Sequence, residues 1–250
     1  MISKNQIKFL HSLLLKKNRL KHQKVILEGQ RLIEESMRAG ANIEYLCLTE
    51  NFKNKISSNN LLNQIESYKI SNSDLKKVTD TKVSQGIIAL VNTKKYHKMN
   101  FDSIQNNNFV VLDGIQDPGN MGTILRTCIW FGIDSIILTS NCCDPFNLKC
   151  IRSGVGAHFY FKNIIIAKSN LVYDYLIEKK YDILVADLNG NNISNYNKKN
   201  NWALILGSEP HGISDTFKNL FKITIPKIGK IESLNVSVAA GIILNEIIDK

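Results

Sequence analysis

The second half of the chain alternates short, almost continuously apolar runs with segments whose apolar residues recur at helical spacing. Such runs are typical of parallel strands buried on both faces, and the segments between them predict helices. The predicted strands lie at 108–114, 133–140, 181–188, 202–208 and 221–227, and the predicted helices at 120–132, 170–180 and 235–249. This order predicts an α/β fold in which helices cover both faces of a parallel sheet.

The first ninety residues repeat both patterns on a smaller scale. Ile7, Leu10, Leu13 and Leu14 lie at helical spacing within 5–20, which predicts one helix. The other predicted elements are strands at 24–29, 43–49 and 86–91 and a helix at 29–40 that ends at Gly40. Together they predict a separate, small α/β unit.

Residues 92–107, NTKKYHKMNFDSIQNN, are polar and follow neither period. They predict a linker, so we expect one domain over 1–91 and a second over 108–250. The Asn-rich stretches at 51–64 and 190–201 predict loops.

The charge of the chain favours a polyanionic partner. Apolar residues make up 44% of the 250 residues and charged residues 22%, as in ordinary globular proteins. Lys and Arg exceed Asp and Glu by 32 to 22, a formal charge of +10 that favours nucleic acid. Residues 1–24 carry seven Lys and Arg and no acid. This segment suits phosphate contacts, although a solvated helix face gives the same pattern.

Two common contexts are not indicated. No run of about 18 apolar residues occurs, so we expect no membrane-spanning helix. The five cysteines are odd in number and form no C-x-x-C pair, so neither a disulfide framework nor a zinc site is predicted. This usage is typical of the reducing cytoplasm.

The segment LDGIQDPGNMGTILRT, residues 112–127, places a glycine-containing turn between an apolar strand and a helix, where α/β sheets bind ligands. Gly114, Gly119 and Gly122 do not follow the G-x-G-x-x-G spacing of dinucleotide-binding folds, and no acid ends the next strand. A strand–helix turn with a capping Asn is the simpler interpretation. However, Arg126 in an otherwise apolar helix indicates a carboxylate or phosphate partner.

The segment LILGSEPHGIS, residues 204–214, ends a buried strand with Gly207, which lets backbone amides approach a ligand. Ser208, Glu209 and His211 suggest a hydrolase, but the G-x-S-x-G motif is absent and these neighbours need not face one another.

The segment IPKIGKIESLNVSVAAGIIL, residues 225–244, puts Glu232, Ser233, Leu234 and Asn235 before a strongly apolar helix. Polar groups beside an apolar wall suit a nucleoside ligand. The alternative interpretation is a core helix that is capped by Ser233 or Asn235.

Taken in this order, the three segments resemble the motifs of the SpoU (TrmH-type) ribose 2′-O-methyltransferases of the SPOUT superfamily. The resemblance covers 108–250. In addition, ILEGQRLIEE at 26–35 and SQGIIALV at 84–91 are similar to the start and end of the family's L30e-like, RNA-binding domain. The resemblance implies a deep trefoil knot around S-adenosylmethionine in the C-terminal domain and a homodimer packed through the last helix.

The resemblance also implies roles for individual residues. The catalytic positions that it implies are Asn120, Arg126, Glu209, Ser233 and Asn235. The implied cofactor-binding positions are Leu206, Gly207, Ile225, Gly229 and Leu234, and the implied RNA-binding positions are Glu28, Gly29 and Arg31. Pro210 departs from the family, in which this position is often small.

The implied reaction is the metal-free methylation of a ribose 2′-hydroxyl by S-adenosylmethionine, in ribosomal RNA rather than transfer RNA because a separate N-terminal domain is present. An arginine stays protonated, so we expect Arg126 to anchor phosphate and stabilise the developing alkoxide, with Glu209 as an orienting residue. The alternatives are a transfer RNA enzyme, a catalytically silent RNA-binding protein and a Rossmann-type enzyme, which the missing ribose acid disfavours.

Overall fold

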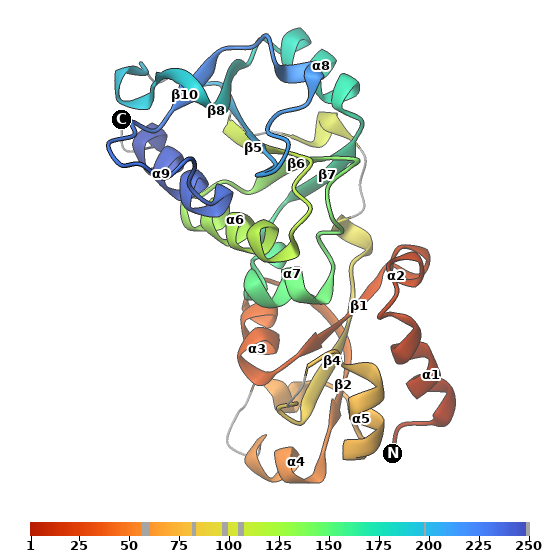
Figure 1. Cartoon of the computed structure of the whole chain (residues 1–250). Helices are drawn as coiled ribbons and strands as arrows, with labels where there is room; N and C mark the ends of the chain where they lie inside the picture. Colours follow the sequence, from red (N-terminus) through yellow and green to blue (C-terminus); the bar gives the residue numbers. More distant parts are fainter. Residues whose placement is uncertain (57–60, 82–83, 97–99, 105–107, 198, 249–250) are drawn as a thin grey trace.

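The computed structural model describes residues 1–56, 61–81, 84–96, 100–104, 108–197 and 199–248. The chain forms two α/β halves, which lie one above the other in Figure 1 with the N-terminal half at the bottom. No helix in the described part of the chain has the length and apolar character needed to span a membrane.

The N-terminal half is built on a mixed sheet in the order β1-β4-β2-β3, in which only β2 and β3 are parallel. Its elements are α1 (Lys4–Ser12), α2 (Lys16–His22), β1 (Lys24–Glu28), α3 (Gln30–Arg38), β2 (Asn42–Leu48), α4 (Glu50–Ile56), β3 (Ser67–Lys69), α5 (Asn72–Val78) and β4 (Ile87–Asn92). The predicted strands at 24–29, 43–49 and 86–91 and the helix at 29–40 are confirmed. The prediction of a loop throughout 51–64 is wrong where α4 forms, and 57–60 lie outside the described residues.

The prediction of one helix over 5–20 is also wrong, because the chain breaks between α1 and α2. Leu15 has an extended backbone, with φ of −90° and ψ of 131°. Arg19 Nη1 donates to the carbonyl oxygens of Leu13 and Leu14, at 3.0 and 2.8 Å. These two carbonyls lie at the end of α1, where helical partners are missing, so the Arg19 side chain stabilises the break.

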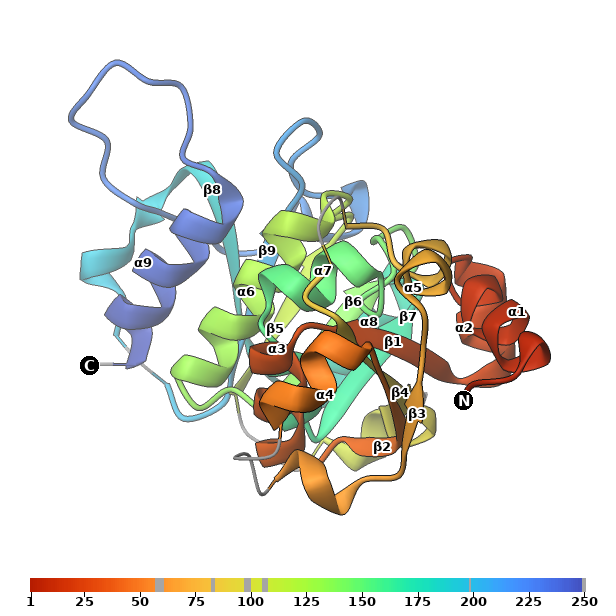
Figure 2. The same ribbon diagram turned by 90° about the horizontal axis from the view of Figure 1, so that it is seen from below.

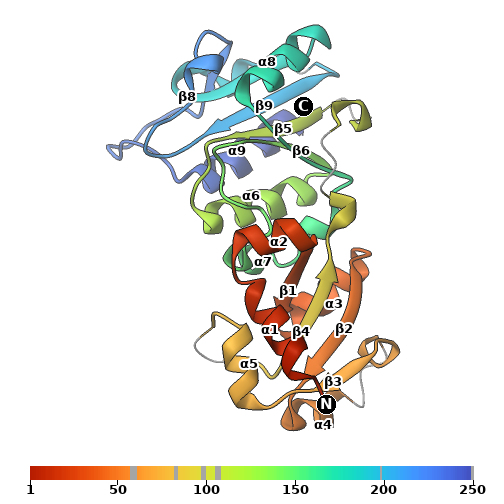
Figure 3. The same ribbon diagram turned by 90° about the vertical axis from the view of Figure 1, so that its right-hand side faces the viewer.

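The C-terminal half contains a six-stranded sheet in the order β10-β8-β9-β5-β6-β7, and every neighbouring pair is parallel, as predicted. Its elements are β5 (Asn108–Asp113), α6 (Pro118–Trp130), β6 (Ser135–Thr139), α7 (Leu148–Ser153), β7 (Asn163–Ala167), α8 (Ser169–Glu178), β8 (Asp182–Asn192), β9 (Trp202–Gly207), β10 (Lys222–Thr224) and α9 (Val236–Ile248). The sequence patterns missed α7 and β7. The segment between β10 and α9 is a long loop that extends away from the rest of the molecule (Figures 2 and 3).

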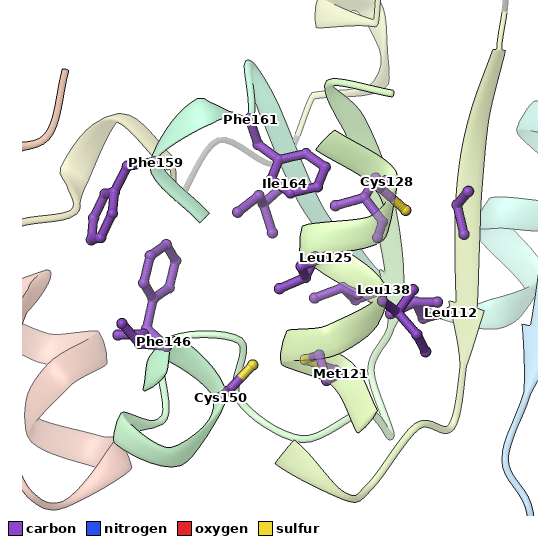
Figure 4. Close-up of a cluster of buried hydrophobic side chains, with 14 of the residues drawn as sticks. Leu112, Met121, Leu125, Cys128, Leu138, Phe146, Cys150, Phe159, Phe161 and Ile164 are labelled. Carbon is purple, nitrogen blue, oxygen red and sulfur yellow. The ribbon is translucent and has the colours of Figure 1, made fainter. Parts of the chain in front are cut away.

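Both faces of the parallel sheet are buried. Alternate residues of β5 belong to different cores: Val110 and Leu112 face α6, whereas Phe109 and Val111 pack with residues of α8. The period of two in a strand produces this division. Figure 4 shows the α6 side, where Leu125 and its neighbours lie between the sheet and the aromatic side chains around α7. The near-continuous apolar runs of the sequence follow from this two-sided burial.

We call the interface between the two halves the seam, and it has polar contacts of its own. Arg19 of α2 forms a buried ion pair with Asp144 of the C-terminal half, with 2.7 Å between Nη2 and Oδ2. Tyr96, within the predicted linker 92–107, is buried, and its hydroxyl donates to the Phe159 carbonyl at 3.0 Å. One apolar core also runs across the seam. The domain boundaries at 91 and 108 therefore remain a prediction.

Replacing Arg19 with Ala should destabilise the protein by about 3–5 kcal/mol, because it leaves the Asp144 carboxylate buried and uncompensated. The matched control is Arg152→Ala, which removes the partly exposed Arg152–Asp80 pair across the same seam and should cost about 1 kcal/mol or less. Urea denaturation of both variants and the wild type measures the two losses. Equal losses of stability in the two variants would contradict the conclusion that the buried Arg19–Asp144 pair is the stronger contact between the halves.

Candidate active site

A pocket of about 510 Å³ lies beyond the carboxyl ends of β8 and β9. Its walls come from the end of β8, the turn after β9 and the long loop before α9. The structure brings all five predicted cofactor positions into its lining: Leu206, Gly207, Ile225, Gly229 and Leu234. This position agrees with the rule that open parallel sheets bind ligands at the carboxyl ends of their strands.

The turn after β9 is tight because its backbone folds back on itself. Ser208 and Gly212 exchange two backbone hydrogen bonds, of 3.0 and 2.8 Å. A Cβ atom at Gly207 would lie 2.5 Å from the Gly212 carbonyl oxygen, so only glycine fits there. Pro210 lies inside this turn, where neither of the two closing bonds uses its nitrogen. The departure from the family at Pro210 is therefore compatible with a closed turn.

Glu209 joins the three sequence motifs through a single carboxylate oxygen. Its Oε1 accepts hydrogen bonds from Asn120 Nδ2 at 3.0 Å, Asn235 Nδ2 at 2.6 Å and the Val236 backbone N–H at 3.0 Å. Asn235 Nδ2 also donates to Asn120 Oδ1 at 3.0 Å. Four of the five predicted catalytic residues are thus close to the pocket, because Ser233 lines it together with Glu209.

We call Glu209, Asn120, Asn235 and the Val236 N–H the Glu209 cluster. The N-termini of α6 and α9 position it. Asn120 lies in the first turn of α6, where its backbone N–H donates to the capping side chain of Asp117 at 2.8 Å. That bond and a second one from Lys149 hold the pKa of Asp117 below its ordinary value. At the other helix, Asn235 Oδ1 accepts from the backbone N–H of Ser237 at 3.0 Å. Of the two predicted caps of α9, Asn235 therefore fills the role, and the Glu209 carboxylate lies near the positive end of the helix dipole.

The structure does not bring Arg126 into this cluster. Arg126 is exposed on α6 and does not line the pocket. Among the described residues, no carboxylate forms an ion pair with its guanidinium. Trp130, one turn further along α6, is also exposed, at 84%.

The three predicted RNA-binding residues lie in the N-terminal half, at the turn between β1 and α3, and do not line the pocket. Gly29 is buried with φ of +101°, and Glu28 Oε1 accepts from Thr81 Oγ1 at 2.7 Å. Of the three, only Arg31 is exposed.

Sequence reasoning missed the wall that the end of β8 contributes, Ala186 to Asn189. Asp187 is held there by the backbone N–H of Asn189 and by Lys222, and these bonds lower its pKa. The available signal was polar residues at the end of an apolar strand, the same signal that identified the turn after β9.

Comparisons of this chain with known proteins agree on one family. The SpoU rRNA methylase family matches residues 107–245, and an MRM3-like substrate binding domain matches residues 4–89. One similar protein is the 23S rRNA (guanosine(2553)-2′-O)-methyltransferase RlmP of Bacillus subtilis (strain 168). It is 30% identical over 249 residues, covering 97% of this chain and 96% of RlmP.

Solved structures share the fold over nearly the whole chain. A TrmH-family protein from Porphyromonas gingivalis is 30% identical and superposes with a TM-score of 0.83, covering 98% of each chain. The SpoU methyltransferase AviRb from Streptomyces viridochromogenes, solved with AdoMet, has a TM-score of 0.85 at 20% identity, covering 99% of this chain and 98% of AviRb. At that identity, AviRb supports the fold alone.

Glu209→Ala should lower the free energy of unfolding by about 1 kcal/mol, because three N–H donors lose their shared acceptor while water replaces part of it. Glu209→Gln keeps a carbonyl acceptor and should lose less. The control is Glu232→Ala in the neighbouring loop, whose exposed carboxylate has no hydrogen bond or ion pair within the described chain, and it should change stability by at most about 0.5 kcal/mol. Urea denaturation compares them, and equal effects of the two alanine variants would contradict the role of Glu209.

Proposed function

The chain belongs to the SpoU rRNA methylase family, and from this premise we propose that it transfers a methyl group from S-adenosylmethionine to a ribose 2′-hydroxyl of ribosomal RNA. The observation that carries the proposal is the Glu209 cluster, in which the three motif segments meet at the rim of one pocket. Ribosomal RNA is favoured over transfer RNA because the similar RlmP is named for 23S rRNA and the match to it covers both halves.

The residues of the pocket fit S-adenosylmethionine. A volume of about 510 Å³ lies within the range of small-molecule sites, about 300–1,000 Å³. Leu206, Ile225 and Leu234 offer apolar surface for a base, and Gly207 and Gly229 leave backbone groups open to its polar edge. We assign the cofactor to these five residues. When bound, it supplies a methyl group that its sulfonium activates for transfer.

The side chains of the cluster position the reacting groups. Glu209 Oε1 accepts three hydrogen bonds, and we therefore assign Glu209 to holding Asn120 and Asn235 in place. Ser233 lines the pocket, and we assign its hydroxyl to a contact with the ribose or the cofactor. Arg126 remains protonated and therefore cannot act as the base. We assign it to an RNA phosphate, and the proton of the 2′-hydroxyl passes to water or to that phosphate.

We also propose a homodimer that forms through α9. Val238 and Ile242 expose 50% and 41% of their surface on this helix, which packs against α6. Burial of this apolar face would stabilise a dimer. Multi-angle light scattering should therefore give a dimer at micromolar concentration. The double variant Val238→Glu/Ile242→Glu should shift it to a monomer. The control Leu171→Glu/Ile177→Glu alters equally exposed residues of α8 and should leave the dimer intact. A monomeric wild type would contradict the proposal.

We also propose a trefoil knot and a cytoplasmic location. We propose the trefoil knot because the chain leaves β10 at the sheet edge and returns to α9 past the turn that holds Glu209. A crystal structure traced from β9 to α9 tests it. We propose the cytoplasm because all five cysteines are free thiols. Cell fractionation tests the location.

The activity is tested by the transfer of tritiated methyl groups from S-adenosylmethionine to 23S ribosomal RNA transcribed in vitro. We expect transfer by the wild type and a loss of about 10²–10³ in rate for Arg126→Ala, because the substrate phosphate loses the cation that positions it. Arg126→Lys should recover little, since an ammonium lacks the guanidinium fork. Calorimetry should show unchanged cofactor binding in both. Arg38→Ala, at an exposed arginine of α3, is the control. No transfer by the wild type would contradict the function, and normal transfer by Arg126→Ala would remove Arg126 from it.

A further inference from the structure

The basic segment that begins the chain forms α1 and α2, which lie along one side of the N-terminal half (Figures 1 and 3). Not all of its charge is available to a partner. Arg19 is buried in the ion pair with Asp144, and Lys24 pairs with Glu44 at 2.6 Å. The lysines of α2 differ from both, because Lys16, Lys17 and Lys21 are exposed.

These lysines form one continuous face. At about 100° per residue, Lys16, Leu20, Lys17 and Lys21 follow one another around an arc of about 140° on α2. Leu20 is 43% exposed between the lysines. Within the described part of the chain, no carboxylate forms an ion pair with any of the three lysines. We call these four residues the α2 basic face.

The opposite side of α2 is fixed to the catalytic half. Arg19 binds Asp144 through Nε and Nη2, at 3.0 and 2.7 Å. The loop that carries Asp144 is joined to the first motif, because the Cys143 backbone N–H donates to the Ile115 carbonyl at 2.9 Å. Two residues further on, Asp117 caps α6, whose first turn carries Asn120 of the Glu209 cluster. The α2 basic face is therefore held at a set position relative to the active site.

Lys16 also lies near the catalytic half. Burial is the largest cause that raises the pKa of the Cys143 thiol to about 12, and the charge of Lys16 acts in the opposite direction. Lys16 thus lies close enough to act on Cys143, which directly precedes Asp144 in the catalytic half.

We propose that the α2 basic face binds the phosphate backbone of the substrate RNA and sets the distance between that contact and the active site. This inference rests on the proposed function and specifies how the substrate is held. Three unpaired ammonium groups suit phosphates, and Leu20 between them suits the apolar edge of a ribose or base. RNA fits better than a protein partner, since the face has no aromatic or arginine anchor and the whole chain carries a charge of +10. The predicted residues Glu28, Gly29 and Arg31 lie outside this face.

The test compares two triple variants with the same change in charge. The first is Lys16→Glu/Lys17→Glu/Lys21→Glu. The control is Lys168→Glu/Lys179→Glu/Lys180→Glu, at exposed lysines flanking α8, at the far end of the catalytic half (Figure 1). The whole chain is used, because removal of 1–90 would uncover Asp144 and the shared core. Filter binding measures the affinity for radiolabelled 23S ribosomal RNA, transcribed in vitro, over a series of salt concentrations.

We expect the α2 variant to bind at least about tenfold more weakly at ~0.1 M salt, with the slope of log affinity against log salt smaller by about two to three, one per lost phosphate contact. The control should keep the wild-type affinity and slope, and calorimetry should show wild-type cofactor binding in both. Equal loss in both variants, or loss in neither, would overturn the inference. A wild type that binds this RNA but transfers no methyl group would instead overturn the proposed function, and the binding data would still decide the role of the α2 basic face.

Discussion

Glu209 Oε1 accepts hydrogen bonds from Asn120 at the start of α6 and from Asn235 and Val236 at the start of α9. Asn120 and Asn235 are 89 and 26 residues from Glu209 in the chain. One oxygen therefore fixes the relative positions of two helix N-termini and the turn after β9. The pocket depends on this constraint, because much of its lining comes from that turn and from the loop that ends at Asn235. A carboxylate suits the position, since both helix dipoles favour a negative charge there.

The Arg19–Asp144 ion pair is the second constraint, and it acts between the halves. Arg19 donates through Nη1 to the carbonyls at the break after α1, and its bond to Asp144 holds α2 against the loop beside the first motif. A tether of this kind gives the N-terminal half a fixed orientation, which a flexible linker would not. For an enzyme that must place one ribose among the many of a large RNA, such a fixed distance between a binding surface and the active site contributes to selectivity.

Local sequence patterns were sufficient to predict an element where buried positions repeat regularly along it. The alternation in β5 follows from its two cores, and the polar residues after β9 and before α9 predicted two walls of the pocket. Tertiary contacts decided the rest. At the break between α1 and α2, Arg19 donates to the Leu13 carbonyl from a position that its bond to Asp144 fixes, and the three-residue β3 pairs with β2 over too short a length to have a pattern. Arg126 shares a helix with Asn120 but not its surroundings, since only the fold determines which side chains of α6 meet the Glu209 cluster.

The proposed enzyme places the methyl group on the 2′-oxygen of a ribose. Alkaline hydrolysis tests it directly, because a 2′-O-methyl group removes the nucleophile that cleaves the adjacent phosphodiester. Ribosomal RNA transcribed in vitro is labelled by the protein with tritiated S-adenosylmethionine, digested with alkali and separated by chain length. If the protein methylates a ribose, the label remains in an alkali-resistant dinucleotide. Label released as a mononucleotide would place the methyl group on a base and contradict the account.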